Sequence, residues 1–175
     1  QLDEYNQERR QIEFSMKEEA LGLVDCICAK HGQTPDVIAI YGSQWHQGVV
    51  GILAGRLKEQ LNRPSIVFGE VEDEILRGSA RSINGVNIRD IFSNLAEEYP
   101  DLLLSHGGHA MAAGVSLYKS NFKQFKALLS ERVSDLFQKG LPEVEWETDG
   151  EIKGHEFEIE LARSLKDWMP WGQTF

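Results

Sequence analysis

The chain has 175 residues and a mass of 19.8 kDa, with 41% hydrophobic and 26% charged residues. This composition is typical of a globular protein and argues against a disordered, collagen-like or disulfide-stapled chain. No run approaches the roughly 20 apolar residues of a membrane helix, and the acidic start of the chain is unlike a secretion signal. We therefore expect a cytoplasmic protein with no membrane partner.

The net charge of −10 argues at first against a nucleic-acid partner, because phosphate binding usually depends on lysine and arginine. However, residues 1–20 and 141–175 together hold −9 of this charge, so residues 21–140 are nearly neutral. This central region contains six basic residues between Arg56 and Arg89, interrupted by an acidic stretch at 70–74. The charge therefore excludes only a protein that is basic over its whole surface.

Residues 2–30 place apolar side chains at helical spacing between charged ones, which predicts one long helix. We interpret residues 1–34 as a connector helix rather than a piece of the compact core. Cys26 and Cys28 would point to different faces of this helix, which argues against a disulfide or a zinc site. Because the chain also lacks an initiating methionine, we expect it to be a fragment of a longer protein.

Residues 35–140 alternate between strand and helix patterns, which predicts an α/β domain. The predicted strands are 37–41, 65–68, 75–82, 102–105 and 114–118. The predicted helices are 46–61, 88–99 and 121–138. After Pro142, acidic and apolar residues alternate up to Ile152, which predicts a strand and the opening of a second domain over 141–175.

The segment from His106 to Gly114 is rich in glycine and alanine and contains Gly107, Gly108 and His109. Such a segment permits a ligand to approach the backbone closely, and adjacent glycines can turn amides toward an anion. A tight connection between strands with an incidental histidine would need the same glycines. The pattern alone leaves both interpretations open.

Two further segments could bind an anion. Arg77, Ser79 and Arg81 would project from one face of a strand and could grip a phosphate, although a solvated sheet face fits them equally well. His46 precedes a helix that carries three glycines, and free amides at a helix start favour anions. A capping or core role for His46 is the alternative. Motifs for nucleotide-binding loops, serine hydrolases and metal centres are absent from the sequence, so we expect no metal ligands here.

These three segments, in their order and spacing, closely resemble the C-terminal half of the RecJ family of bacterial single-strand-specific DNA exonucleases in the DHH superfamily. The matching segments are Trp45–Ile52, Arg77–Ser82 and Gly107–Gly114. The resemblance runs from the connector helix to Phe175, and residues 170–175 look like the family's entry into an OB-fold domain. Residues 141–175 would then be the truncated beginning of that domain.

The resemblance implies a DHH-associated domain, a mixed β-sheet flanked by helices that faces a separate DHH domain across a cleft. The Mn²⁺ or Mg²⁺ ligands of the family would lie in that DHH domain, so this chain alone is expected to be inactive. In the intact family enzyme, phosphodiester bonds of single-stranded DNA are hydrolysed from the 5′ end during repair and recombination. A single-strand-binding protein or a helicase would be a further partner.

Carried over by motif, Ser79 and Arg81, with Arg77 beside them, would bind the region of the terminal 5′ phosphate. Gly107, Gly108 and His109 would approach the phosphate of the scissile nucleotide, and His46 would help to close the pocket.

Two alternatives remain open. One is a DHH-superfamily phosphodiesterase that acts on short oligonucleotides or cyclic dinucleotides. The other is an interaction module that docks a protein through the acidic residues 143–151.

Overall fold

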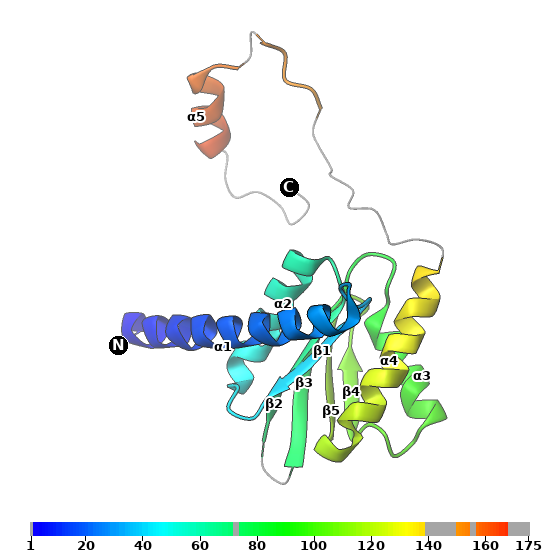
Figure 1. The fold of residues 1–175 in the computed structure, drawn as a ribbon. Coiled ribbons are helices and arrows are strands. Elements are labelled where there is room, and N and C mark those ends of the chain that lie inside the picture. Colours follow the sequence, from blue (N-terminus) through cyan, green and yellow to red (C-terminus); the bar gives the residue numbers. More distant parts are fainter. Residues whose placement is uncertain (1, 72–73, 139–149, 155–156, 168–175) are drawn as a thin grey trace. The chain divides into compact units, whose positions relative to one another are not determined.

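The computed structural model describes the chain except for residues 1, 72–73, 139–149, 155–156 and 168–175, which are grey in Figure 1. The chain divides into two compact units, Gln1–Pro142 and Glu143–Phe175, and each is described by itself. Within the described residues, no helix combines the length and the apolarity that crossing a membrane requires.

The first unit is built on a five-stranded mixed sheet with the strand order β1-β2-β3-β5-β4 (Figure 1). β1 runs parallel to β2, and all other neighbouring strands are antiparallel. The strands are β1 (Ile38–Gly42), β2 (Ser65–Glu70), β3 (Ile75–Arg81), β4 (Ser105–Gly108) and β5 (Ala112–Tyr118). A mixed sheet with flanking helices confirms the predicted fold class.

Two helices of this unit begin at residues whose side chains cap the first turn. α2 follows His46, whose ring accepts a hydrogen bond from the amide of Gly48, and it ends at Asn62 in a left-handed conformation. α3 follows Asn87, whose side chain accepts a hydrogen bond from the amide of Asp90. The helices are α1 (Leu2–His31), α2 (Gln47–Leu61), α3 (Ile88–Glu98) and α4 (Phe122–Phe137), with a 3₁₀ turn η2 (Lys119–Asn121) before α4.

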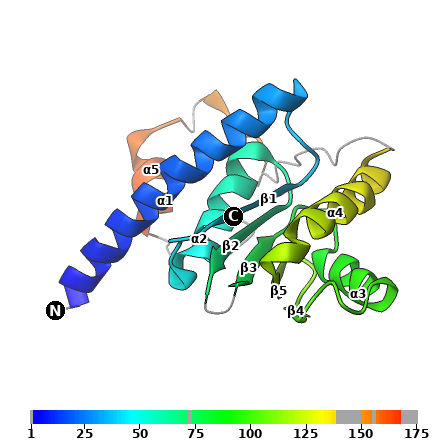
Figure 2. The same ribbon diagram turned by 60° about the horizontal axis from the view of Figure 1, so that its bottom comes forward.

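Two hydrophobic clusters lie on opposite faces of the sheet. The larger one joins alternate residues of the strands, such as Phe68 and Leu117, to α3 and α4. The smaller one joins Ile40 and Val67 to α1 and α2. Figure 2 shows the two helix pairs on the two sides of the sheet. Because successive strand residues point to opposite faces, the same strands serve both clusters.

The structure corrects two expectations. The strand predicted at 102–105 begins instead at Ser105 and uses the glycine-rich segment, because Leu102 and Leu103 are buried from the preceding loop. The long first helix does not stand apart from the core over its C-terminal half, since Met16 and Ala20 are buried in the smaller cluster.

In the second unit, the described residues include α5 (Ile159–Asp167). Most of the predicted acidic strand near 143–152, and the segment 170–175 that resembles an OB-fold entry, lie outside the described residues. The domain boundaries at 34 and 140 stay predictions.

Candidate nucleic-acid interface

Three strands bring the predicted site segments together in rows across one face of the sheet. Ser79 on β3 lies opposite Gly114 on β5, and Gly114 lies opposite Gly107 on β4. The next row along contains Arg77, Ser116 and Ser105. The row on the other side contains Arg81 and Ala112. The glycine-rich segment and the arginine-serine segment are therefore neighbours in space, although about 30 residues separate them in the sequence.

An open hollow of about 410 Å³ lies over the first two of these rows, and Arg81 and Ala112 lie beyond its lining. It is bounded by β3, β4 and β5 and by the first turn of α2. Its lining consists of Gln47, Val50, Arg77, Gly78, Ser79, Ser105, His106, Gly107, Gly114, Val115 and Ser116. The lining combines hydroxyl groups, imidazole and amide side chains and one guanidinium, and it includes no carboxylate. Such a surface can donate hydrogen bonds to an anion without repelling it.

Two glycines, Gly107 and Gly114, form the part of the hollow's surface that we call the glycine floor, where no side chain projects from the strands. A Cβ added at Gly107 would meet no atom of the chain within 4 Å, and one at Gly114 would meet only the carbonyl oxygen of Gly78 at 3.9 Å. Packing inside the described chain therefore does not demand glycine at either position. Glycine in a strand is unfavourable because it loses backbone entropy and offers no side chain to pack. The packing of the described residues therefore leaves both glycines unexplained.

Gly108, the third residue of the motif, has a different reason to be glycine. Its φ is 135°, and an added Cβ would lie 2.6 Å from the carbonyl oxygen of Ala112. This glycine shapes the strand end rather than the floor of the hollow, and it is not among the lining residues.

Arg81 and Ser79 are joined directly. The Nη1 of Arg81 donates to the Oγ of Ser79 at 3.0 Å and to the carbonyl oxygen of Ala80 at 2.9 Å. α2 passes close by, because a Cβ at Gly51 would lie 3.1 Å from Ser79 Oγ and 3.2 Å from Arg81 Nη2. This glycine lets the guanidinium lie between the helix and the strand.

The histidines predicted for the site lie at its margins. His46 caps α2, with its Nδ1 accepting from the Gly48 amide at 3.1 Å, which leaves Nε2 as the protonated nitrogen. His109 is exposed and forms two backbone hydrogen bonds with Ala112, so it extends the row of Arg81. Neither histidine lines the hollow itself.

The turn that carries His109 is held firmly from below. The connection between β4 and β5 consists of His109, Ala110 and Met111. The amide of Ser82 donates to the carbonyl of Met111 at 2.9 Å, and the amide of Ile88 donates to that of Ala110 at 3.0 Å. The end of the hairpin therefore has a fixed position beside the start of α3.

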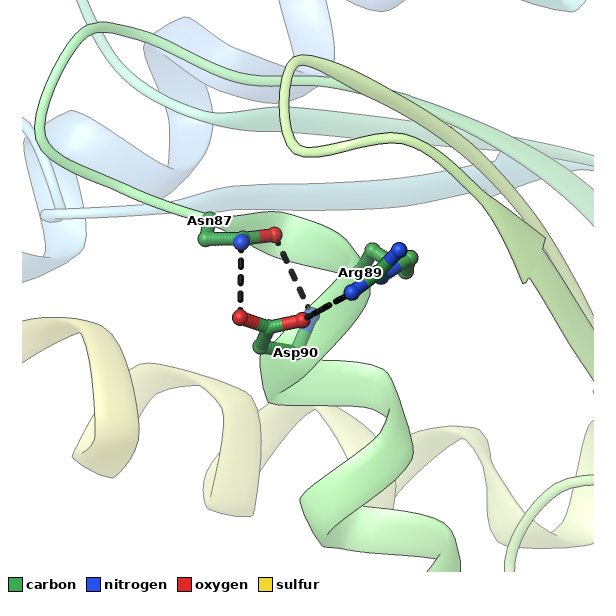
Figure 3. A network of polar contacts seen from close by, with 3 residues as sticks. All are labelled: Asn87, Arg89 and Asp90. Carbon is green, nitrogen blue, oxygen red and sulfur yellow. Dashed lines mark hydrogen bonds and ion pairs between the residues drawn. The ribbon is translucent and has the colours of Figure 1, made fainter.

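Other members of the central basic run are engaged away from the hollow. Arg89 donates to a carboxylate oxygen of Asp90 at 3.1 and 3.2 Å, and Asp90 is held in turn by Asn87 (Figure 3). Arg56 pairs with glutamates at 3.7 and 3.8 Å. Of the arginines between 56 and 89, Arg77 and Arg81 are those placed for the site.

Shifted pKa values belong to lysines outside the hollow. The pKa of Lys119 is raised, chiefly by its hydrogen bond to Glu70, and the pKa of Lys126 is lowered by burial. Neither lysine is among the residues that line the hollow.

The described residues do not fit a catalytic metal. Among them, no group of three or more histidine, cysteine, aspartate or glutamate residues could hold an ion. The chemistry that this part of the chain offers is binding through hydrogen-bond donors and positive charge.

The sequence predicts the strand face of Arg77, Ser79 and Arg81 but not all of the residues that line the hollow beside it. Gln47, Ser105 and Ser116 line the hollow and had not been selected. Period-two spacing from Gly107 and Gly114 could have identified the two serines, since each lies on the same face as its glycine. No sequence signal could have placed Gln47 beside Arg77, because that contact depends on how α2 packs on the sheet.

Comparisons with known proteins agree with this architecture. A family model described as the DHHA1 domain matches residues 34–135. The single-stranded-DNA-specific exonuclease RecJ of Salmonella typhimurium is 43% identical over 175 residues, which cover 100% of this chain and 30% of that protein. RecJ of Haemophilus influenzae is 41% identical, covering 99% of this chain and 30% of that protein. The chain therefore spans about 30% of the length of these relatives.

Solved structures give the same result. A crystal structure of RecJ from Thermus thermophilus in complex with Mn²⁺ has a TM-score of 0.62 and 26% identity, covering 77% of this chain and 18% of that one. A crystal structure of exonuclease RecJ bound to manganese has a TM-score of 0.61 and 27% identity, covering 76% of this chain and 30% of that one.

Proposed function

The chain belongs to the DHHA1 domain family, and from this membership we propose that it is the substrate-binding part of a 5′–3′ single-stranded-DNA exonuclease. The observation that carries the proposal is the glycine floor of Gly107 and Gly114, open to solvent beside Ser79 and Arg81. A sugar-phosphate backbone is the ligand that such a floor suits, because it needs close approach and several donors.

Each site residue then has a stated role. Ser79 and Arg81 bind the 5′-terminal phosphate region, with Arg77 adding positive charge on the same strand face. Gly107, Gly108 and His109 adjoin the phosphate of the scissile nucleotide. His46 supplies an N–H from Nε2 at the rim, since its Nδ1 is occupied in capping α2.

Hydrolysis in this proposal needs a second domain. RecJ structures similar to this chain are complexes with Mg²⁺ or Mn²⁺, and the described residues here offer no ligand group for such an ion. We therefore place the metal ligands in a DHH domain of the intact protein. The chain alone should bind DNA and leave it uncut when Mn²⁺ is added.

We propose a cytoplasmic enzyme of DNA repair and recombination that works beside a single-strand-binding protein or a helicase. Residues 141–175 begin an OB-fold-like domain in this proposal. A phosphodiesterase for short oligonucleotides or cyclic dinucleotides is not favoured, because the curated relatives named above are single-stranded-DNA-specific exonucleases.

Removing the Arg81 guanidinium tests the proposed phosphate contact. In the intact protein, Arg81→Ala should weaken binding of a 5′-phosphorylated single strand by about 1.5–3 kcal/mol, measured by fluorescence anisotropy. Arg56→Ala is the matched control, because it removes the same charge from an exposed arginine that pairs with Glu13 and Glu59 and lies off the strand face of Ser79 and Arg81. Equal losses in the two variants would show that only net charge matters and would contradict the assigned site.

A further inference from the structure

The loop before α2 is seated in a notch formed by two paired glycines. Gly42 at the end of β1 lies opposite Gly69 on β2. A Cβ at Gly42 would lie 2.4 Å from the indole ring of Trp45. A Cβ at Gly69 would lie 2.5 Å from both the carbonyl oxygen of Trp45 and the side-chain nitrogen of Gln47. Residues 45–47 can pack directly against β1 and β2 only because Gly42 and Gly69 have no Cβ atoms.

Trp45 fixes this loop in place. Its side chain is 3% exposed and packs in the smaller cluster with α1 and α2. Its indole Nε1 donates to Oε2 of Glu19 on α1 at 2.7 Å, across 26 residues of sequence. An indole N–H that donates to a carboxylate is a charge-assisted hydrogen bond, which fixes geometry more firmly than a neutral one. The position of the next residues therefore depends on the packing of α1.

The notch places the amide of Gln47 at the wall of the hollow. Gly69, beneath this amide, pairs with Arg77, so Gln47 lies beside the row of Arg77, Ser116 and Ser105. Gln47 is exposed, and within the described part of the chain its side-chain amide makes no hydrogen bond. The Gln47 amide is held in position, has free N–H donors and lies near the Arg77 guanidinium and the Ser105 and Ser116 hydroxyls. This arrangement favours a role in binding over a structural role.

We infer that Gln47 is a direct contact of the bound strand and donates from its side-chain amide to a phosphate oxygen. Trp45 and Glu19 are its positioning residues. This inference rests on the proposed function of the hollow, and it adds Gln47 as a donor beside the one proposed for His46. The amide adds a donor without adding positive charge, which suits a chain that is acidic overall.

Three variants of the intact protein test the contact by anisotropy with a labelled single-stranded oligonucleotide. Gln47→Ala should weaken binding about tenfold, because a hydrogen bond to a charged group is lost. Gln47→Glu should weaken it further, since the new carboxylate has the same shape but only accepts and carries negative charge. Gln44→Ala, in the same exposed loop and outside the hollow, is the control and should bind as the unmodified protein does.

The positioning role has its own test. Glu19→Gln and Glu19→Leu remove the same charge, but only glutamine keeps an oxygen that can accept from Trp45. Under conditions where both variants are folded, Glu19→Leu should bind the strand about two- to threefold more weakly than Glu19→Gln. Equal affinities in these two variants would contradict the positioning role.

The outcomes separate this inference from the proposed function. If Arg81→Ala loses affinity while Gln47→Ala and Gln47→Glu bind normally, the strand face of Ser79 and Arg81 binds DNA and the Gln47 contact is wrong. If none of these variants changes affinity, the proposed function itself fails. A loss in Gln47→Ala that Gln47→Glu restores would show a packing role and would also overturn the inference.

Discussion

The two faces of one sheet use glycine for opposite reasons. Gly78 on β3 turns toward the face covered by α3 and α4, and a Cβ there would lie 2.5 Å from the ring of Phe68. Gly114, in the neighbouring strand, turns toward the hollow, where a Cβ would have no neighbour nearer than 3.9 Å. The packing of the chain requires glycine at position 78, but it does not explain the glycine at position 114.

This difference separates stability from binding along the same strands. On β5, Val115 and Leu117 are buried in the larger cluster, while the alternate residues Gly114 and Ser116 line the hollow, whose lining Val115 also joins. Since alternate residues serve the two faces, the sequence of one strand can be selected for core packing and for a ligand at the same time. Substitutions on the two faces should therefore have separable effects.

The largest effect should come from filling the open floor. We expect Gly114→Val to weaken single-strand binding at least about tenfold, because the new side chain occupies the space of the sugar-phosphate backbone. Valine suits a strand, and its Cβ would lie 3.9 Å from the carbonyl oxygen of Gly78, at ordinary contact distance, so the unfolding free energy should change by less than about 1 kcal/mol. Thermal unfolding and anisotropy on one preparation measure both. If the variant binds the strand with normal affinity, the proposal that the sugar-phosphate backbone lies over Gly114 is wrong.

Adding a side chain to a glycine on the packed face should lower stability and leave DNA affinity unchanged. Gly78→Ala should destabilise the chain by about 1–3 kcal/mol, because the methyl group overpacks the ring of Phe68. That ring is held edge-on by Phe122 and Phe125, at centroid distances of 5.6 and 5.8 Å, and has little room to move. Urea unfolding measures the loss. Gly78 lines the hollow only with backbone atoms, and the added methyl group would lie against Phe68 on the other face. Under conditions where the variant is folded, its DNA affinity should therefore match that of the unmodified protein.

The smallest effect should come from the helix side of Arg81. Gly51→Ala would add a methyl group 3.1 Å from Ser79 Oγ and 3.2 Å from Arg81 Nη2, so the guanidinium must shift. We expect binding to weaken by about two- to fivefold, as for a disturbed rather than a lost hydrogen bond. Because alanine favours a helix by up to about 1 kcal/mol over glycine, stability should be unchanged or higher. Gly55→Ala, where the added Cβ has no neighbour within 4 Å, is the control.

Much of this arrangement could be predicted from the sequence, and the rest depends on packing. Period-two spacing correctly placed Ser79 and Arg81 on one strand face, and their hydrogen bond confirms it. β4 was misplaced, because the apolar residues Leu102 and Leu103 look like a strand while glycines do not. The hollow itself could not be predicted, since the order β3-β5-β4 joins segments that are not consecutive.

The most direct test of the central claim is an NMR titration of the chain with a short single strand, 5′-phosphorylated or 5′-hydroxyl. The account predicts that the amides of Ser79, Arg81, Gly107 and Gly114 shift, that they shift more with the 5′ phosphate, and that α4 stays unchanged. Shifts that map to α4, or none at these four amides when the strand is in large excess, would contradict the claim that this face binds DNA.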